Sequence, residues 1–389
     1  MKIIHITASY KPAYIYGGPI QSVGILCEQL RVYGKKLNCE IELLTTTANG
    51  KTELDVIPGK TYQVNGVSVR YFNRLTKDHT HFSPSLLHAL AKEIKKNKEQ
   101  KLVIHIHAWW NLVSILSCLV AKWYKIPVVL SPRGMLTSYT LSNRNGFTKD
   151  KIHRFLGEKL LEYSRIHATS EKEKADILSL IHPKSIIVIP NMVNFPTAQI
   201  NRGISKPNDP FKLIFLSRIE EKKGLELLFD ALSTIKMEWS LTLAGSGEAI
   251  YLNKLKTQIK TLGIQDHISW IGQVSNEHKF NLMAKHDLLV LTSFNENFAN
   301  VVIESLSVGT PALISKQVGL ADYVDSKGLG WITNLDVESI RKNILSAYAD
   351  RQKRQFINET AHHIINTDFN PEKITGQYMD LYQSIENFE

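Results

Sequence analysis

Short apolar runs alternate along the whole chain with segments whose apolar residues recur at helical spacing. Each run has the length of a strand, and polar loop residues separate it from the helical pattern that follows. Strands that alternate with helices predict βαβ units, in which parallel sheets carry helices on both faces. The predicted strands are Ile3 to Thr7, Ile41 to Thr46, Val67 to Phe72, Leu102 to His107, Val128 to Ser131, Ile166 to Thr169, Ile186 to Ile189, Leu213 to Ser217, Leu241 to Ala244, Ile268 to Ile271, Leu288 to Thr292, Ala312 to Ser315 and Trp331 to Thr333.

A chain of 389 residues is too long for one ordinary hydrophobic core. The segment from Pro190 to Pro210 is rich in Pro, Asn and small residues and interrupts the alternation. We therefore expect an α/β fold of two Rossmann-like, doubly wound domains, residues 1–192 and 211–370, joined by a linker at 193–210. We also expect residues 371–389 to form a C-terminal helix that packs back on the first domain. Ligands of such sheets bind beyond the carboxyl ends of the strands, so the cleft between the facing domains is the predicted active site.

Two glutamates eight positions apart, Glu296 and Glu304, follow the strand that ends at Thr292. The pattern predicts a polar loop that contains Glu296 and a helix over 298–308 that contains Glu304, about 9 Å beyond the helix start. Two carboxylates that act on one bond in a retaining glycosidase lie roughly 5–5.5 Å apart, so this pair is better suited to two parts of a long ligand. The alternative is a solvated loop glutamate and a helix glutamate paired with a lysine.

Cations and glycines occur at two other strand-to-helix turns. Arg218 ends a predicted strand and Lys223 precedes the next helix, so both can point at one anion beside a helix N-terminus. The alternative is a surface turn in which Glu220 and Glu221 balance these charges. Gly17 and Gly18 follow the first strand and would let backbone amides approach a phosphate. An ordinary connecting loop is the alternative there.

Charge is distributed unevenly between the halves. Residues 1–192 carry 27 Lys and Arg against 14 Asp and Glu, whereas the remaining residues carry 20 against 23, so the first half accounts for the net charge of +10. This excess indicates an anionic partner, either an acidic membrane surface or a nucleic acid. No nucleic-acid-binding module is recognisable, so we expect the membrane. Basic clusters fall at Lys92, Lys95, Lys96, Lys98 and Lys101, and at Lys149, Lys151, Arg154 and Lys159. Solvated helix faces are the commoner explanation for either cluster alone.

The three cysteines, Cys27, Cys39 and Cys118, have neither metal-ligand spacing nor the even number of a disulfide framework. The first ten residues form a strand pattern rather than a signal peptide, and the longest apolar stretch, Leu112 to Ala121, is too short to span a bilayer. We expect a cytoplasmic protein, with peripheral contact to the inner face of the cytoplasmic membrane.

Several motifs occur together in one order: an early Gly-Gly-Pro, PNMVN at 190–194, SRIEEKKG at 217–224, AGSGE at 244–248, WIGQV at 270–274, and two glutamates separated by seven residues before S-x-G-T-P. In this order and over most of the chain, the sequence resembles the retaining glycosyltransferases of family 4, which have the GT-B fold. The resemblance implies transfer of a sugar from a UDP- or GDP-linked donor, without a metal ion or other cofactor.

The resemblance also implies roles for individual residues. Arg218 and Lys223 correspond to the pair that neutralises the donor diphosphate, Glu304 to the carboxylate that binds the ribose, and Glu296 to the one that holds sugar hydroxyls and faces the reacting centre. We take Glu296, Arg218 and Lys223 as the catalytic residues. The other predicted donor-binding residues are Gly17, Gly18, Gln273, Val274, Phe298, Ala299 and Asn300.

One position departs from the family pattern. After the strand that ends at Ser131, many relatives carry a histidine near the donor sugar, whereas this chain has Arg133. A guanidinium cannot act as a base, so Arg133 is expected to stabilise a phosphate or an acidic group. His107 is the nearest replacement candidate, although a buried histidine at a strand end is the commoner explanation. Both are predicted on the acceptor and sugar side.

The first domain faces the acceptor in this family, and here that domain is basic. We therefore expect a saccharide acceptor, linked to lipid diphosphate at an anionic membrane, in the synthesis of cell-surface polysaccharide. A nucleotide-sugar epimerase of the same fold and a non-catalytic nucleotide-sugar-binding protein are the alternatives.

Overall fold

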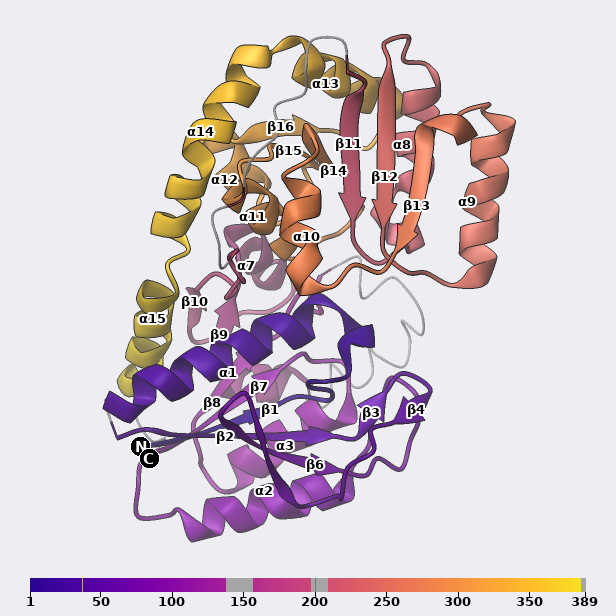
Figure 1. Cartoon of the computed structure of the whole chain (residues 1–389). Helices are drawn as coiled ribbons and strands as arrows, with labels where there is room; N and C mark the ends of the chain where they lie inside the picture. The colour runs from indigo at the N-terminus through magenta and orange to yellow at the C-terminus, as the bar shows by residue number, and fades with distance from the viewer. Residues whose placement is uncertain (37, 138–156, 197–199, 201–208, 386–389) are drawn as a thin grey trace. The chain divides into compact units, whose positions relative to one another are not determined.

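The structure, a computed structural model, describes residues 1–36, 38–137, 157–196, 200 and 209–385. The chain divides into two compact units, shown in Figure 1: Met1–Val193 together with Pro371–Glu389, and Asn194–Asn370. Part of the predicted linker, residues 197–199 and 201–208, lies outside the described residues, as do Lys149, Lys151 and Arg154 of the second basic cluster.

An eight-stranded sheet forms the centre of the first unit, in the order β10-β9-β8-β7-β1-β2-β6-β5. All seven apolar runs predicted as strands in this half belong to it, and their neighbouring pairs are parallel, as predicted. The strands are β1 (Lys2–Ile6), β2 (Glu40–Thr46), β5 (Thr61–Val64), β6 (Val67–Phe72), β7 (Leu102–His107), β8 (Val128–Ser131), β9 (Arg165–Ala168) and β10 (Ile186–Val188).

The pattern of apolar runs missed the edge strand β5, which is antiparallel to β6. Its residues alternate between exposed and half-buried, so it has no continuous apolar run. Asn65 and Gly66 join the two strands with φ of 49° and 80°, which is the geometry that Asn-Gly turns favour in two-residue hairpins. A second hairpin, β3 (Ala48–Asn49) and β4 (Thr52–Glu53), was also not predicted.

Successive side chains of each strand point to opposite faces of this sheet, and helices cover both faces. Ile4, Ile6, Ile104 and Ile106 pack with residues of α2 and α3 on one face. On the other face lie α1 and α15, which contact each other, and Tyr378 and Tyr382 of α15 are fully buried. The helices of this unit are η1 (Tyr14–Tyr16), α1 (Gly18–Lys36), α2 (Pro84–Lys96), α3 (Leu112–Trp123), α6 (Glu158–Tyr163), α7 (Glu171–Leu178) and α15 (Pro371–Ser384).

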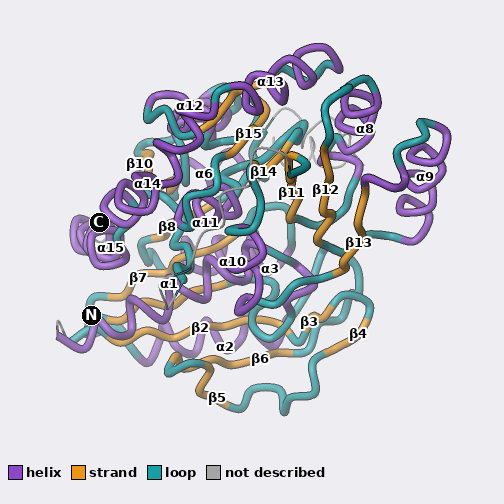
Figure 2. The backbone as a smooth tube through the Cα atoms, turned by 45° about the horizontal axis from the view of Figure 1, so that its top comes forward, coloured by secondary structure: helices purple, strands orange, loops and turns teal. Residues whose placement is uncertain are grey.

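The second unit contains a six-stranded, fully parallel sheet in the order β13-β12-β11-β14-β15-β16. Figure 2 labels its strands β11 to β15. Its strands are β11 (Phe211–Leu216), β12 (Trp239–Ala244), β13 (Ile268–Gly272), β14 (Leu288–Leu291), β15 (Ala312–Ser315) and β16 (Gly330–Thr333). Its helices are η3 (Glu221–Lys223), α8 (Leu225–Ser233), α9 (Ala249–Thr261), η4 (Gln265–His267), α10 (Asn276–Met283), α11 (Asn300–Ser307), α12 (Ala321–Ser326), α13 (Val337–Ala349) and α14 (Arg351–Asp368). The prediction of two Rossmann-like α/β sheets is confirmed.

All three cysteines are free thiols and buried. Among the described residues, no helix is both long enough and apolar enough to cross a membrane.

Candidate active site

The loops after β11 and β14 lie side by side at the carboxyl edge of the second sheet, because these two strands are neighbours. The amide of Phe294 donates to the carbonyl of Lys222 at 2.8 Å, and the Thr292 hydroxyl donates to the carbonyl of Gly224 at 3.0 Å. Gly224 has φ of 63°, and a Cβ atom there would lie 2.2 Å from the Thr292 carbonyl oxygen. Only glycine fits this turn, which fixes Lys223 against the end of β14.

Lys223 and Glu296 form a buried ion pair in this corner. The Lys223 Nζ atom lies 2.6 Å from Oε1 and 3.0 Å from Oε2 of Glu296, and the two side chains are 4% and 19% exposed. Burial lowers the pKa of Lys223, and the Glu296 carboxylate opposes that shift. Burial alone would raise the pKa of Glu296, but Lys223 and Lys222 outweigh it and hold this pKa below its ordinary value. The two short contacts and the lowered pKa of Glu296 are those of a carboxylate bound to an ammonium group.

Glu304 is paired with Lys279, a residue that the sequence analysis missed. Lys279 Nζ lies 2.6 Å from Glu304 Oε1, and the two side chains are 5% and 6% exposed. Lys279 belongs to α10, whose buried residues Phe280 and Met283 gave no sign that a charged neighbour is buried with them. Glu304 is thus a helix glutamate paired with a lysine, as the alternative explanation of the two glutamates expected. That explanation also expected Glu296 to be solvated, whereas Glu296 is bound to Lys223.

Arg218 is less firmly held than Lys223. Its side chain is 43% exposed, and Nη1 lies 2.6 Å from Glu220 Oε1 in the same loop, which agrees with a surface turn that balances its own charges. The turn after β12, which contains Gly245 and Gly247, packs directly on this loop. Cβ atoms on these two glycines would lie 1.9 Å and 2.4 Å from the carbonyl oxygens of Ser217 and Ile219. These glycines therefore permit a close approach of backbone to backbone.

The predicted start of the helix that carries Glu304 is wrong by two residues. Helix α11 begins at Asn300, and Phe298 and Ala299 precede it, so their amides do not belong to its first turn. Ala299 has φ of 68°, a left-handed conformation that no feature of an alanine reveals in the sequence. Glu304 is the fifth helical residue, about 6 Å from the helix start rather than about 9 Å.

The remaining predicted residues of the second unit lie at the same edge. Gln273 and Val274 directly follow β13, with Gln273 exposed and Val274 half-buried. Glu296 is anchored through its backbone to the loop after β15, since its amide donates to the carbonyl of Gln317 and its carbonyl accepts from the amide of Gly319. The predicted donor-binding side chains of this unit thus lie on loops at its carboxyl edge or in the helix that follows β14.

In the first unit, Gly17 ends η1 with φ of 75°, and Gly18 is the first residue of α1. A Cβ atom on Gly18 would have no heavy atom within 4 Å among the described residues. Packing within the protein therefore does not require glycine at this position.

Arg133 and His107 are in contact at the carboxyl ends of β8 and β7. Nε and Nη2 of Arg133 each lie 3.3 Å from His107 Nδ1, and Nη1 donates to Ser22 Oγ at 3.1 Å and to Asn191 Oδ1 at 2.9 Å. His107 is fully buried, whereas Arg133 remains partly exposed. His107 is thus a buried strand-end histidine that supports Arg133.

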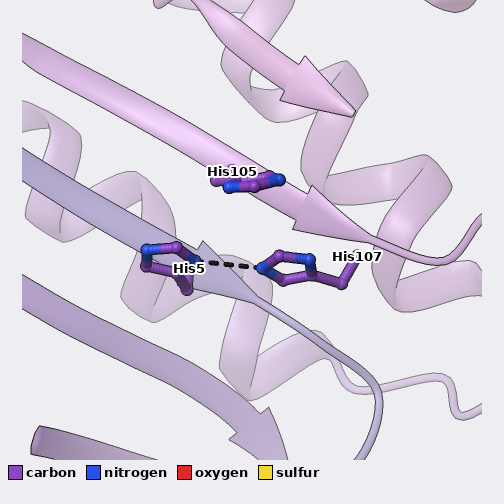
Figure 3. Close-up of side chains that lie close together, drawn as sticks. All are labelled: His5, His105 and His107. Atoms are coloured by element: carbon purple, nitrogen blue, oxygen red, sulfur yellow. Dashed lines mark hydrogen bonds between the residues drawn. The ribbon is translucent and has the colours of Figure 1, made fainter. Parts of the chain in front are cut away.

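Three histidines of this unit lie close enough together to hold a metal ion, as Figure 3 shows. Nitrogen atoms of His5, His105 and His107 lie within 4.8 Å of one another, and all three side chains are buried. His5 and His105 are direct neighbours across β1 and β7. This cluster is the one arrangement of three or more potential metal-ligating side chains found in the described part of the chain.

Two family models match the chain. The model described as Glycosyltransferase Family 4 matches residues 23–195, and the model described as Glycosyl transferases group 1 matches residues 197–363. The first model thus falls in the first unit and the second in the other unit.

Known proteins are similar over most of the chain. An uncharacterised glycosyltransferase of Methanocaldococcus jannaschii is 24% identical over 98% of both chains. The GDP-mannose:cellobiosyl-diphosphopolyprenol alpha-mannosyltransferase of Xanthomonas campestris is 26% identical over 72% of this chain and 74% of its own. The crystal structure of Anabaena HepE in complex with UDP-glucose superposes with a TM-score of 0.73 at 20% identity and covers 99% of this chain and 100% of its own.

Proposed function

Because this chain is a family 4-like glycosyltransferase of the GT-B fold, we propose that it transfers a hexosyl group, with retention and without a metal ion, from a UDP- or GDP-linked sugar to a saccharide hydroxyl. The acceptor we propose is lipid-linked, and the process is the assembly of cell-surface polysaccharide on the cytoplasmic side of the membrane.

The buried Lys223–Glu296 pair is the observation that carries this proposal. An ammonium group and a carboxylate are held together at the carboxyl edge of a parallel sheet, where ligands of this fold bind. Lys223 would neutralise the donor diphosphate, and Glu296 would accept hydrogen bonds from the sugar. Arg218 is the second cation of the diphosphate site, and Glu304 the acceptor of the ribose hydroxyls, since a carboxylate bound to one lysine keeps acceptor capacity.

Positive charge from Lys223 and Arg218 would replace a metal ion at the departing diphosphate. Preformed charge of this kind stabilises a leaving group in the transition state. Sugar transfer should therefore continue after dialysis against a chelator. Loss of transfer on chelation, with recovery on addition of magnesium, would contradict this part of the proposal.

Retention is proposed from the resemblance to family 4, and the pairing of Glu296 bears on how retention would be achieved. Both of its carboxylate oxygens contact Lys223 Nζ, so Glu296 is a poor nucleophile for a covalent glycosyl intermediate. We propose front-face attack by the acceptor hydroxyl. NMR spectroscopy of the first product formed should show the anomeric configuration of the donor, and an inverted product would exclude this mechanism.

A lipid-linked acceptor is supported by the similarity to the Xanthomonas transferase and by the carboxyl edge of the first sheet. Ile15 and Leu75, which follow β1 and β6, are 60% and 70% exposed, and Lys51 and Lys77 are exposed in loops of the same edge. Apolar side chains beside lysines suit the interface of an anionic membrane. The exposed lysines of the 92–101 cluster instead lie at the C-terminal end of α2, at the opposite edge of the sheet.

Flotation with vesicles of neutral and anionic lipid tests this contact. Replacement of Lys51 and Lys77 by glutamate should abolish the preference for anionic vesicles, whereas replacement of Lys95 and Lys96 by glutamate should leave it intact. Equal binding of the unaltered protein to both kinds of vesicle at low salt would contradict the membrane proposal.

Thermal stabilisation by a panel of nucleoside-diphosphate sugars tests the donor class, because a ligand of the folded state raises the melting temperature by mass action. At least one UDP- or GDP-sugar should stabilise the protein more than the free sugar does. Isomerisation of the donor sugar in the absence of an acceptor would instead identify an epimerase. Donor binding without transfer to any acceptor would identify a non-catalytic protein.

A further inference from the structure

Arg133 is a cation whose partners are all neutral. Its guanidinium donates to His107, Ser22 and Asn191, and no carboxylate pairs with it in the part of the chain that the structure describes. Burial lowers the pKa of Arg133, and the nearby Glu173 carboxylate opposes this shift without contacting the guanidinium. Its Oε1 accepts from the amide of Gly134, and its Oε2 accepts from the amide and hydroxyl of Thr169. A partly buried charge is costly when no countercharge accompanies it.

The histidines beneath Arg133 form a hydrogen-bonded chain whose direction can be assigned. A guanidinium only donates, so His107 Nδ1 is the acceptor and its proton is on Nε2. That Nε2–H donates to His5 Nδ1 at 3.0 Å, the contact drawn in Figure 3. The proton of His5 is therefore on Nε2, which is buried and has no hydrogen-bond partner.

A second chain runs in parallel and is fixed by a backbone carbonyl. His167 Nε2 lies 2.8 Å from the carbonyl oxygen of Ile189 and must donate to it, so His167 Nδ1 accepts from Ser131 Oγ at 2.6 Å. Ser131 then accepts from His105 Nε2 at 2.6 Å, and His105 Nδ1 accepts from the hydroxyl of Tyr382 at 2.7 Å. Burial lowers the pKa of all four histidines and so favours neutral rings, and in neutral rings these contacts place the proton on Nε2.

These chains argue against a metal ion at His5, His105 and His107. Each ring has one nitrogen protonated and the other accepting a hydrogen bond, so no lone pair remains for a ligand bond. Burial and Arg133 together lower the pKa of His5 to about 3, and burial is the main cause of the lowered pKa of His105 and His107. The cluster is a neutral scaffold, and Arg133 is the charge that it supports.

The backbone around Arg133 is held in an uncommon conformation. Arg133, two residues after the end of β8, has φ of 52°. Ala108, directly after the end of the neighbouring strand β7, has φ of 71°. Non-glycine residues in this region are strained and cluster at ligand sites. The fold thus aims a guanidinium, on a strained turn and a neutral scaffold, toward the edge where ligands of such sheets bind.

We propose that Arg133 binds an anionic oxygen of the substrate, a carboxylate or a phosphate, which supplies the direct ion-pair partner that the described residues do not provide. This assignment rests on the proposed function. Arginine binds carboxylate and phosphate through paired N–H groups, and Nη2 is only partly engaged, by the long contact to His107. The substrate class is therefore a sugar that bears an acidic group, either a uronate or a phosphate on the donor or on the acceptor.

Thermal denaturation with potassium phosphate, sodium glucuronate and sodium chloride at equal ionic strength tests the site in the unaltered protein. Phosphate and glucuronate should raise the melting temperature above that in chloride, with glucose as the neutral control. Their addition should also move the ring nitrogen signals of His107 and His5 and leave those of exposed His88 unchanged. If phosphate and glucuronate act like chloride and move no signal of His107, the proposal is wrong.

Variants then assign the effect to Arg133. Arg133→Gln should lose the response to glucuronate and only part of the response to phosphate, because phosphate is also a ligand for the diphosphate site at Lys223. Arg133→Lys should keep a weaker response to glucuronate, and Arg165→Gln, at the amino end of β9, should respond like the unaltered protein. An anion response that Arg133→Gln retains in full would overturn the proposal. Stabilisation by nucleoside-diphosphate sugars should persist in every variant, so its absence would count against the proposed function and not against this site.

The source of the anion is found by comparing donors. If it is a uronate of the donor sugar, the preference for UDP-glucuronate over UDP-glucose should fall about tenfold in Arg133→Gln, the loss expected for one charge-assisted hydrogen bond. If it belongs to the acceptor, that preference should not change, and about tenfold should be lost only with acceptors that carry a phosphate or a uronate. An equal response of neutral and acidic substrates in both positions would refute the assignment.

Discussion

Removal of either charge of the Lys223–Glu296 pair alone should destabilise the second unit far more than removal of both charges in one variant. Lys223→Met leaves a carboxylate that is 19% exposed without its cation. Glu296→Gln leaves an ammonium that is 4% exposed facing an amide. The double variant has neither charge, and its side chains are of similar size to the originals. The perturbation therefore isolates the electrostatic part of the pair.

The expected magnitude follows from burial and distance. Removal of one partner of a buried ion pair costs about 3–5 kcal/mol, and we expect about 3 kcal/mol for Lys223→Met because water reaches Glu296 in part. Replacement of both partners by neutral residues costs about 1 kcal/mol or less. The coupling energy of the cycle, which is the sum of the two single costs less the cost of the double variant, should therefore be about 5–7 kcal/mol. The exposed pair Lys254–Glu226, at 3.2 Å and 63% and 25% exposure, should give less than about 1 kcal/mol.

Hydrogen exchange of peptides from α8 and α11 measures the unfolding free energy of this unit by itself, which matters because two units need not unfold together. Transfer activity is measured in parallel. The double variant should regain stability but stay about 10²- to 10³-fold less active, because the cation at the diphosphate is still missing. Costs of the single variants that add within about 0.5 kcal/mol would refute the buried-pair interpretation, and full activity of the double variant would refute the role of Lys223.

Three further results are expected. Gly18→Ala should change stability by less than about 0.5 kcal/mol, since its Cβ would have no heavy atom of the described residues within 4 Å. It should nevertheless weaken donor binding measured by calorimetry, and unaltered affinity would remove Gly18 from the phosphate site. Ala299→Gly should stabilise the second unit by about 1 kcal/mol in urea denaturation, because it relieves φ of 68°; a loss of stability would contradict the strain. The stability of the first unit should fall as pH falls from about 6.5 toward 3, because the unfolded chain then binds more protons than the folded one. Each of the four neutral histidines should contribute up to about 1.4 kcal/mol per pH unit. A constant urea midpoint between pH 7 and pH 5 would contradict the neutral network.

The strands were predictable because parallel strands are buried on both faces and become continuous apolar runs. Strand β5 was missed for the opposite reason, since an antiparallel edge strand has one face in water, although the Asn65-Gly66 turn was a usable signal. The positions of Arg218, Lys223 and Glu296 in loops after strands, and of Glu304 in the following helix, could be predicted from the order of strand, loop and helix. Lys279 was not predictable, because its burial depends on the approach of α10 to α11, which no local pattern specifies.

Lys223 and Arg133 have opposite kinds of partner, and this difference bears on how each would meet a ligand. In the second unit the buried lysines already have carboxylate partners, and both contacts of Lys223 Nζ go to one carboxylate. An ammonium group has three donors, so Lys223 could contact a phosphate oxygen while it remains bound to Glu296, and the donor need not break the pair. In the first unit, Arg133 is surrounded by neutral groups and has no such internal partner among the described residues. A diphosphate at Lys223 therefore extends an existing ion pair, whereas an acidic group at Arg133 supplies a missing one. Arg133 should accordingly contribute more to the choice between acidic and neutral substrates than Lys223 does.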